Sequence, residues 1–438
     1  MPEPQKKSVL IDLAPFRASR PFTYMWIGAL VTGIGNLLTS VAVGLHIYDL
    51  TGSTFMVSLV GVIALVPTMV AGLWSGGMVD RHDRRLVALG AALLAWTSTL
   101  VIALLAWTGH ETVWSLYLLS ALNAVGAGLA SSSRSAMVPS LVPADLLPAA
   151  GALNGMSMGI VLTTGPALAG LLVGRVGYAW TYSLDVLLFC GSFLGLWALP
   201  AMRPETTSEY KGLAAIKESA RFIARSTVVA MSFVVDIIAM TFGNPRSLFP
   251  AVGAVAVGGG PLTAGILAAA SAVGAIICSG FSGRIVAWRR HGRAVNLAII
   301  AYGAFAAGFG LVLLATVTGR LPGGVGTLSH TNHGALWASI VMLVGMGASD
   351  NVSAIFRNTI LLQAVPDSIR GRMQGIYIMV VTGGPRVGDA FVGVAALAAV
   401  WAPPLIGGLV IMAAIAVLVG LVPAFHRYEA GAQTRLTD

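Results

Sequence analysis

Residues 75–85 read SGGMVDRHDRR and lie between two long apolar runs, at 54–74 and 86–107. The stretch follows a glycine pair with two aspartates, one histidine and three arginines. Each apolar run is long enough to cross a bilayer as a helix, which takes about 20 residues. The charged stretch is therefore expected to be a short loop at a membrane surface, joining two helices that cross in opposite directions.

The composition of the whole chain agrees with this interpretation. Of the 438 residues, 56% are hydrophobic and only 10% are charged, whereas an ordinary soluble domain has about 25% charged residues. So few charges cannot cover a surface that faces water, so the sequence predicts a multi-pass membrane protein. The 53 glycines fit this class, because small residues let membrane helices approach closely.

Twelve segments meet the length requirement for a membrane-spanning helix. They lie at 22–48, 54–79, 86–108, 112–138, 150–174, 178–200, 227–252, 261–288, 294–318, 335–362, 375–399 and 403–425.

The distribution of basic residues predicts the orientation. If the N-terminus is cytoplasmic, most of the 26 lysines and arginines fall on the cytoplasmic side, and the outer loops hold only Arg175 and Arg320. This asymmetry is typical of cytoplasmic loops, so both termini are expected inside the cell. It also accounts for most of the net charge of +9, so we expect no binding to nucleic acid.

The longest polar break between the predicted spans covers 201–226. Leu213, Ile216, Ala220 and Ile223 recur there at helical spacing, which predicts an amphipathic helix on the cytoplasmic face. The break divides the chain into an N-terminal bundle of six helices, a linker and a C-terminal bundle of six helices. The expected boundaries are 1–200, 201–226 and 227–438.

The two halves also resemble each other in sequence. SSSRSAMVPSLVPADLL near the end of the fourth span matches AIFRNTILLQAVPDSIR near the end of the tenth. TTGPALAGLLVG in the fifth span then matches TGGPRVGDAFVG in the eleventh, in the same order. Two ordered matches indicate a duplication. Related six-helix halves are typical of secondary transporters, with the substrate site between the halves near the middle of the membrane.

The opening stretch resembles the loop between the second and third helices of the major facilitator superfamily, which has the pattern Gly-x-Leu-Ala-Asp-Arg-x-Gly-Arg-Lys. Asp83 stands where that pattern has its second glycine. We interpret the stretch as a conformational gate, in which Asp80 would cap the N-terminus of the eleventh helix, where the helix dipole favours an acid. The alternative is that its charges only set the orientation in the membrane. The gate residues carried over are Gly76, Asp80, Arg81, Arg84 and Arg85.

Further stretches resemble the branch of this superfamily that contains the enterobactin exporter and macrolide and multidrug efflux proteins. These are SRSAMVPSLVPADLLPAAGALNG, NTILLQAVPDSIRGRMQGIY and GDAFVG, at 133–155, 358–377 and 388–393. The resemblance implies an all-α protein with twelve membrane helices in two pseudo-symmetric bundles. It also implies a proton-driven exporter of drugs or siderophores in the bacterial cytoplasmic membrane.

Glycines and one proline repeat along the fifth predicted span. The proline leaves a backbone carbonyl unpaired, and the glycines permit bending and close packing. Either a helix-bending motif, as in facilitator exporters, or a packing groove would explain the pattern. The residues are Gly155, Gly159, Gly165, Pro166 and Gly170.

Two acids near mid-depth are the candidates for proton coupling. Asp236 lies in the seventh predicted span and Asp350 in the tenth, and the resemblance implies that these helices line the cavity. A carboxylate that is shielded from water binds a proton more readily, so either residue could bind and release a proton as the cavity opens alternately to the two sides of the membrane. The alternative is permanent neutralisation by Arg246 or Arg357.

The other intramembrane charges form the rest of the predicted network. Arg386 and Asp389 are three residues apart and are expected to pair. Asp350 and Arg357 lie about 10 Å apart on one helix face, too far for a direct helical pair, but they can share a polar channel. Arg134 and Arg357 lie near inner helix ends, where their side chains are expected to extend toward the membrane surface or to bond to loop carboxylates more often than to bind substrate.

Polar and aromatic residues in the predicted cavity helices are candidates for substrate contact. Asn36 and Ser40 share one face of the first span, Phe233 lies on the seventh, and Asn351 lies on the tenth. His46, near the outer end of the first span, is expected to be a solvated interface residue.

No pattern in the sequence indicates enzyme chemistry. We find no phosphate-binding loop and no cysteine or histidine cluster with metal-ligand spacing, and Cys190 and Cys278 are expected to be packing residues. The sequence therefore predicts a monomeric secondary transporter without cofactors, whose partners are a small molecule, protons and the bilayer. A nutrient importer or facilitator, and a lipid-translocating protein, remain alternatives.

Overall fold

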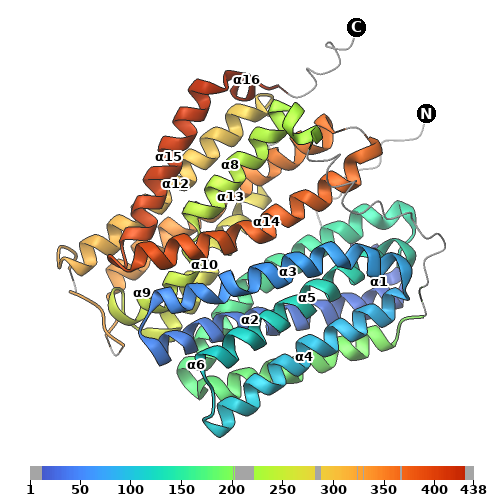
Figure 1. Ribbon diagram of the computed structural model, residues 1–438, viewed down its shortest axis with the longest axis horizontal. Helices are drawn as coiled ribbons and strands as arrows, with labels where there is room; N and C mark the ends of the chain where they lie inside the picture. The colour runs from blue at the N-terminus through green and yellow to red at the C-terminus, as the bar shows by residue number, and fades with distance from the viewer. Residues whose placement is uncertain are drawn as a thin grey trace.

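The computed structural model describes residues 12–200, 202, 221–281, 288–322, 324–328, 330–365 and 367–429, with the backbone alone at 73–81, 194, 362, 367–372, 374–379 and 382. Within these residues every regular element is a helix (Figure 1). The first half contains α1 (Ala14–Ala18), α2 (Arg20–Thr51), α3 (Thr54–Arg81), α4 (Arg84–Thr108), α5 (Val113–Leu141), η1 (Ala144–Leu146) and α6 (Leu147–Trp197). The second half contains α8 (Thr227–Gly243), η2 (Arg246–Leu248), α9 (Phe249–Val255), α10 (Gly260–Gly280), α12 (His291–Val317), α13 (His333–Ala364), α14 (Asp367–Ala396), α15 (Ala402–Leu421) and α16 (Pro423–His426).

Ten helical segments of the described chain are long and apolar enough to cross a membrane. One of them contains α6, which has 51 residues and is interrupted at Gly177, where φ is 82° and ψ is 179°. Only glycine adopts such a backbone conformation readily, so Gly177 separates the fifth and sixth predicted spans. The eleventh predicted span corresponds to α14, which has 30 residues but is not among the ten.

Within the charged stretch at 75–85, the loop between the two helices is much shorter than the sequence suggests. Helix α3 continues to Arg81, and α4 begins at Arg84. Asp83 caps α4, because its carboxylate accepts hydrogen bonds from the backbone N–H of Arg85 at 2.9 Å and of Met202 at 3.2 Å. Asp83 therefore holds the start of α4 against the chain that follows α6. The superfamily loop pattern has a glycine at this position, so comparison with it did not indicate this role.

The helices of each half pack mainly against each other. In the first half, α2 packs along α6, and α4 packs against α5 and α6. In the second half, α12 packs against α13 and α15, and α14 packs against α8. Two crossings join the halves, α3 with α14 and α6 with α10, and Figure 1 shows α3 and α14 running side by side between them.

At both crossings a glycine allows close contact near the ends that the charge distribution predicts to be outside the cell, with backbone at one crossing and with a side chain at the other. A Cβ atom on Gly265 of α10 would lie 2.9 Å from the Cα atom of Gly170 on α6. At the other crossing, a Cβ atom on Gly61 of α3 would collide with the carboxylate of Asp389 on α14. We call the end of the molecule that the charge distribution predicts to be outside the cell the far end.

The opposite end of the molecule, where α2 and α4 begin with arginines, is called the basic end. On α6, the Cβ positions of Gly151 and Gly155 meet no atom within 4 Å, and the same holds for Gly72 on α3 and Gly280 on α10. The close glycine contacts between the halves therefore lie toward the far end, and these four glycines nearer the basic end make no such contact with the described residues.

The expected amphipathic helix of the linker lies mostly outside the described residues. Of 201–226, the structure describes residue 202 and residues 221–226, and 221–225 are helical.

Candidate functional site

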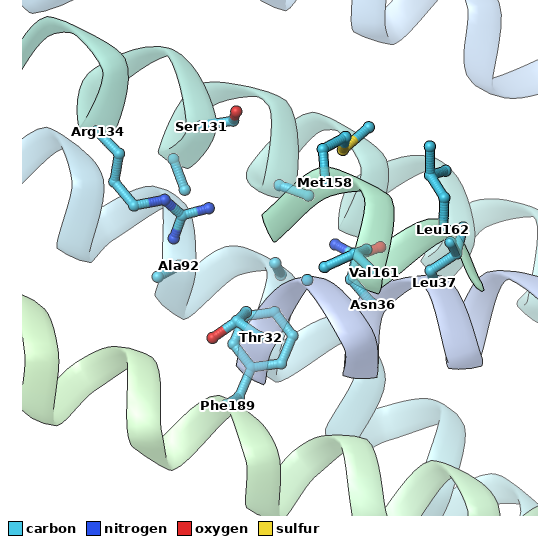
Figure 2. Close-up of a pocket in the computed structure, with 14 residues that line it drawn as sticks. Thr32, Asn36, Leu37, Ala92, Ser131, Arg134, Met158, Val161, Leu162 and Phe189 are labelled. Atoms are coloured by element: carbon cyan, nitrogen blue, oxygen red, sulfur yellow. The ribbon is translucent and has the colours of Figure 1, made fainter. Parts of the chain in front are cut away.

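A cavity of about 230 Å³ lies within the N-terminal half, among α2, α4, α5 and α6. Asn36 is part of its wall, and Arg134 extends its guanidinium into it from α5 (Figure 2). Substrate contact by Asn36 stays a prediction. Arg134 therefore does not reach for the membrane surface as the sequence suggested. The lining residues are Thr32, Gly33, Asn36, Leu37, Ala92, Ala95, Ala127, Ala130, Ser131, Arg134, Met158, Val161, Leu162 and Phe189.

A second site is formed by three charged groups in the C-terminal half. The Arg357 guanidinium on α13 lies 2.6 Å from a carboxylate oxygen of Asp236 on α8. Its other nitrogen lies 3.7 Å from a carboxylate oxygen of Asp350, also on α13. The Asp236 and Arg357 side chains are 1% and 3% exposed, whereas that of Asp350 is 33% exposed. One arginine thus bridges a fully buried acid and a partly exposed acid.

The contact between Asp350 and Arg357 corrects the expectation that seven residues of helix keep them apart. Side chains on a helix point back toward its N-terminus, and Arg357 is C-terminal to Asp350 on the same helix face. The long arginine side chain therefore spans about two turns and reaches the aspartate directly. Spacing along the axis alone underestimates this reach.

The α8 helix ends at Gly243, and the chain continues through Asn244 and Pro245 into η2 and α9. The Asn244 side-chain amide donates to the Pro385 carbonyl of α14 at 3.1 Å, and the Tyr302 hydroxyl donates to the Gly243 carbonyl at 2.8 Å. The Gly243 carbonyl at the break is thus bonded inside the protein, as the bilayer requires of backbone polar groups. Arg246 follows the break and is exposed.

The expected pair between Arg386 and Asp389 does not form. Arg386 donates to the Ala64 carbonyl of α3 at 2.6 Å and also to the Thr68 hydroxyl. Asp389 accepts instead from the Ser247 hydroxyl at 2.9 Å. Both residues lie at the crossing of α14 and α3, so partners on neighbouring elements replace the local one, and Arg386 connects the two halves directly.

A buried acid in the N-terminal half has only hydroxyl partners. Asp185 on α6 accepts from Thr39 of α2 at 2.6 Å and from Thr99 of α4 at 3.4 Å. Asn123 of α5 donates to the Thr99 hydroxyl at 2.9 Å. The site therefore connects four helices, and no basic side chain of the described chain pairs with this acid.

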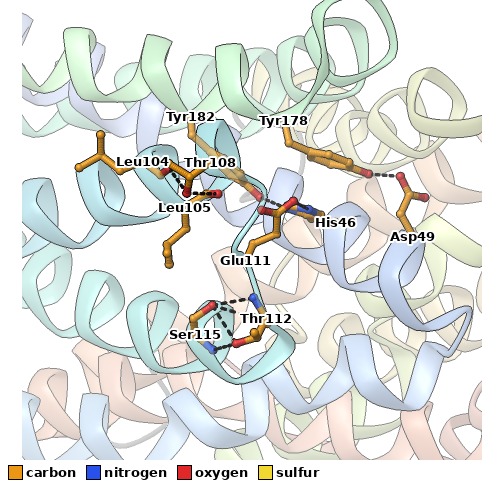
Figure 3. A network of polar contacts seen from close by, with 10 residues as sticks. All are labelled: His46, Asp49, Leu104, Leu105, Thr108, Glu111, Thr112, Ser115, Tyr178 and Tyr182. Atoms are coloured by element: carbon orange, nitrogen blue, oxygen red, sulfur yellow. Dashed lines mark hydrogen bonds and ion pairs between the residues drawn. The ribbon is translucent and has the colours of Figure 1, made fainter.

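His46 is buried, which corrects the expectation of a solvated residue. Its ring stacks on Tyr178 with centroids 4.0 Å apart, and its Nε2 atom lies 3.4 Å from Glu111 (Figure 3). Its Nδ1 atom lies 3.2 Å from the Tyr182 hydroxyl. Helical periodicity of α2 alone did not indicate these partners, because they come from α6 and from the loop that precedes α5.

The remaining cavity candidates have different surroundings. Ser40 is exposed, and Asn351 accepts a hydrogen bond from Ser279 of α10 at 3.4 Å. Phe233 is 7% exposed and belongs to an apolar cluster with Leu361 and Met373. It is therefore a packing residue of the C-terminal half in this conformation, and not the cavity wall that its aromatic ring suggested.

The gate residues are only partly covered by the described side chains. Those of Gly76, Asp80 and Arg81 lie outside them, so the capping of α14 by Asp80 stays a prediction. Arg84 donates to the Ala136 carbonyl of α5 at 2.9 Å, and Arg85 donates to the Trp197 carbonyl of α6 at 2.9 Å.

The glycine and proline pattern of the fifth span lies within α6. The helix continues through Pro166, and bending there stays a prediction. A Cβ atom on Gly165 would lie 2.9 Å from that of Leu37 on α2, whereas Gly170 faces α10 and Gly159 faces Ile276 of α10. Several of these glycines thus occupy helix contacts, as the packing-groove alternative predicts.

Comparison with known proteins agrees with this arrangement. The profile of a family described as transmembrane secretion effectors matches residues 11–436. Enterobactin exporters of Escherichia coli and Shigella boydii are 26% identical over 393 residues, which cover 89% of this chain and 88% of theirs. The enterobactin exporter of Citrobacter koseri is 25% identical over 390 residues, with the same coverage.

Solved structures show the same fold. A POT family transporter in complex with a thioalcohol-conjugated peptide has a TM-score of 0.73 at 11% identity, over 93% of this chain and 96% of that one. The xylose transporter of E. coli in an inward-open conformation has a TM-score of 0.66 at 14% identity, over 94% and 97%. This multi-pass membrane protein therefore belongs to the transmembrane secretion effector family of the major facilitator superfamily, whose members are transporters and not enzymes.

Proposed function

We propose that the chain is a secondary active exporter of the bacterial cytoplasmic membrane that moves amphipathic small molecules outward in exchange for protons. It would do so with twelve crossings in two six-helix bundles, divided at 201–226, with both termini in the cytoplasm. Support comes from the family, from the names of the relatives, which are exporters, and from the break in α6 at Gly177. The observation that carries the coupling is the Asp236, Arg357 and Asp350 cluster.

In this cluster Asp350, the partly exposed acid, is the residue suited to exchange a proton. Arg357 is held closely by the sealed Asp236 at 2.6 Å and more loosely by Asp350 at 3.7 Å. With Asp350 protonated, the three groups carry no net charge, which a closed and dry cavity tolerates. With Asp350 ionised, they carry one negative charge, which costs several kcal/mol or more without water. Protonation at Asp350 would thus permit the change of conformation.

The alternation itself would use the two crossings between the halves. Their close glycine contacts lie toward the far end, so we take this conformation as closed on that side, with the site facing the cytoplasm in the proposed orientation. Substrate would enter from that side, and the halves would then rock to open the far end. Arg386 would break its contacts with α3 during this motion, because those contacts join the two halves.

The function can be tested in two steps. Thermal stabilisation of the purified protein by a panel of siderophores, including enterobactin, and of common antibiotics identifies a ligand. Uptake of that ligand into everted vesicles, in which export becomes accumulation, should then collapse when an uncoupler is added. Accumulation that survives the uncoupler would exclude proton coupling, and equilibration without accumulation would favour a facilitator.

Asp350→Asn should abolish proton-driven accumulation while leaving exchange of labelled for unlabelled ligand across the vesicle membrane. Asparagine keeps the size of the side chain but cannot carry the proton. The matched control is Asp185→Asn, because Asp185 is also an intramembrane acid but is fully buried with hydroxyl partners. We expect this control to accumulate ligand as the wild type does. Equal loss in both variants would contradict the assignment of coupling to Asp350.

A further inference from the structure

One arginine in the cavity of the N-terminal half has no counter-charge. Arg134 lines the cavity from α5, and among the residues that the structure describes no acid pairs with it and no acceptor takes a hydrogen bond from it. No acidic side chain belongs to the cavity wall. Its guanidinium points into the cavity beside Thr32 and Phe189 (Figure 2).

The other intramembrane arginines with described contacts are used within the protein. Arg357 is shared by two aspartates, and Arg386 donates to the Ala64 carbonyl and the Thr68 hydroxyl. Arg84, at the start of α4, donates to the Ala136 carbonyl, two residues beyond Arg134 on α5. A second positive charge is therefore fixed near the same part of α5, and it makes the potential around Arg134 more positive.

An uncompensated guanidinium in an apolar site is costly, and an anion that binds it removes the cost. Five donors in a planar fork suit carboxylate, sulfonate or phosphate oxygens. The rest of the wall suits an apolar body, since it contains Phe189, Met158 and several alanines and leucines. Met158 is a flexible side chain that adapts to different shapes, and Asn36 and Ser131 add hydrogen-bonding groups.

We propose that Arg134 is the anion-binding residue of a substrate subsite in the N-terminal half, and that the preferred substrates are amphipathic anions. This assignment rests on the proposed transport function and specifies its substrate class. An organic anion with an aromatic or aliphatic body would place its acidic group on Arg134 and its body against Phe189 and Met158. An organic cation of the same size would be repelled, because the cavity wall offers it no acid.

Two dyes with the same aromatic framework provide the test. They are 8-anilinonaphthalene-1-sulfonate, which is an anion, and N-phenyl-1-naphthylamine, which is neutral. Each is titrated by fluorescence against the protein in nanodiscs of zwitterionic phosphatidylcholine, with the signal of empty nanodiscs subtracted. Arg134→Gln should weaken binding of the anionic dye by roughly tenfold, the usual effect of losing a charge-assisted hydrogen bond. Binding of the neutral dye should change by less than about twofold, because it makes no such bond.

Arg134→Lys should retain part of the preference, because lysine keeps the charge but lacks the fork. Arg175→Gln is the matched control, since Arg175 is an exposed arginine on α6 of the same half, and it should change neither titration. If Arg134→Gln weakens both dyes equally, or neither, the anion subsite is wrong. If Arg134→Gln does not fold, a partial loss of the anion preference in Arg134→Lys serves as the measurement instead. Equal binding of both dyes to the wild type, or an anion preference that a folded Arg134→Lys keeps in full, overturns the proposal.

The titration uses no proton gradient, so it separates the two proposals. A charge preference lost in Arg134→Gln, together with ligand accumulation that ignores uncouplers, would support the anion subsite and reject proton coupling. The opposite pair of results would reject the anion subsite and leave the exporter proposal in place.

Discussion

Arg357→Ala should destabilise the protein by roughly 3–5 kcal/mol, the usual cost of removing one partner from a buried ion pair. Asp236, at 1% exposed, would lose the guanidinium 2.6 Å away and keep a negative charge in an apolar interior. Asp350 would lose its partner as well. Thermal unfolding of the purified protein should therefore begin at a clearly lower temperature, and transport should fall to background in the same preparation.

The double variant Asp236→Asn with Arg357→Gln should recover much of the stability, because it removes the buried charge together with its partner. It should not recover proton-driven transport, since Asp350 would no longer have Arg357 as its partner. Arg293→Ala is the control for loss of a guanidinium, as Arg293 is exposed on α12. If Arg357→Ala is as stable as this control, the pair with Asp236 contributes little, and the cluster is not the organising feature of the C-terminal half.

The sequence predicted those parts of the fold that depend on local chemistry. Apolar runs of bilayer length identify helices, because unpaired backbone groups cannot remain in lipid. The boundary between α3 and α4 does fall within the charged stretch at 75–85. The duplicated segments also take matching positions, since Gly165 packs against α2 and its counterpart Gly384 packs against Met240 of α8.

Contacts that cross between helices were beyond the sequence. The pairing of Arg386 with Asp389 was wrong because the correct partners, Ala64 and Ser247, come from α3 and η2. His46 was taken for a solvated residue because its partner Glu111 lies in a loop 65 positions away. Periodicity shows which face of a helix is polar, but the partner on the next helix follows only from the rotation and depth of both, which packing determines.

Gly265→Val should abolish transport by preventing the far end from closing. Its Cβ atom would lie 2.5 Å from the Pro166 carbonyl oxygen and 2.9 Å from the Gly170 Cα atom. Both are backbone atoms of α6, which cannot move aside as a side chain does. Overpacking of this kind costs about 1–3 kcal/mol, and the same free energy shifts a two-state equilibrium by about 5- to 150-fold. The variant should therefore favour the conformation with the far end open.

Accessibility of the cavity reports this shift directly. A single cysteine at Asn36, in a background with Cys190 and Cys278 replaced, lines the cavity and should resist a membrane-impermeant thiol reagent applied to whole cells. In the Gly265→Val variant the same cysteine should be labelled rapidly from outside. Gly280→Val is the matched control, because Gly280 lies on the same helix with open space at its Cβ position, and its labelling should equal that of the parent. Equal protection in both variants would mean that α6 and α10 do not form the far-end closure, and that the glycines at their crossing serve helix packing alone.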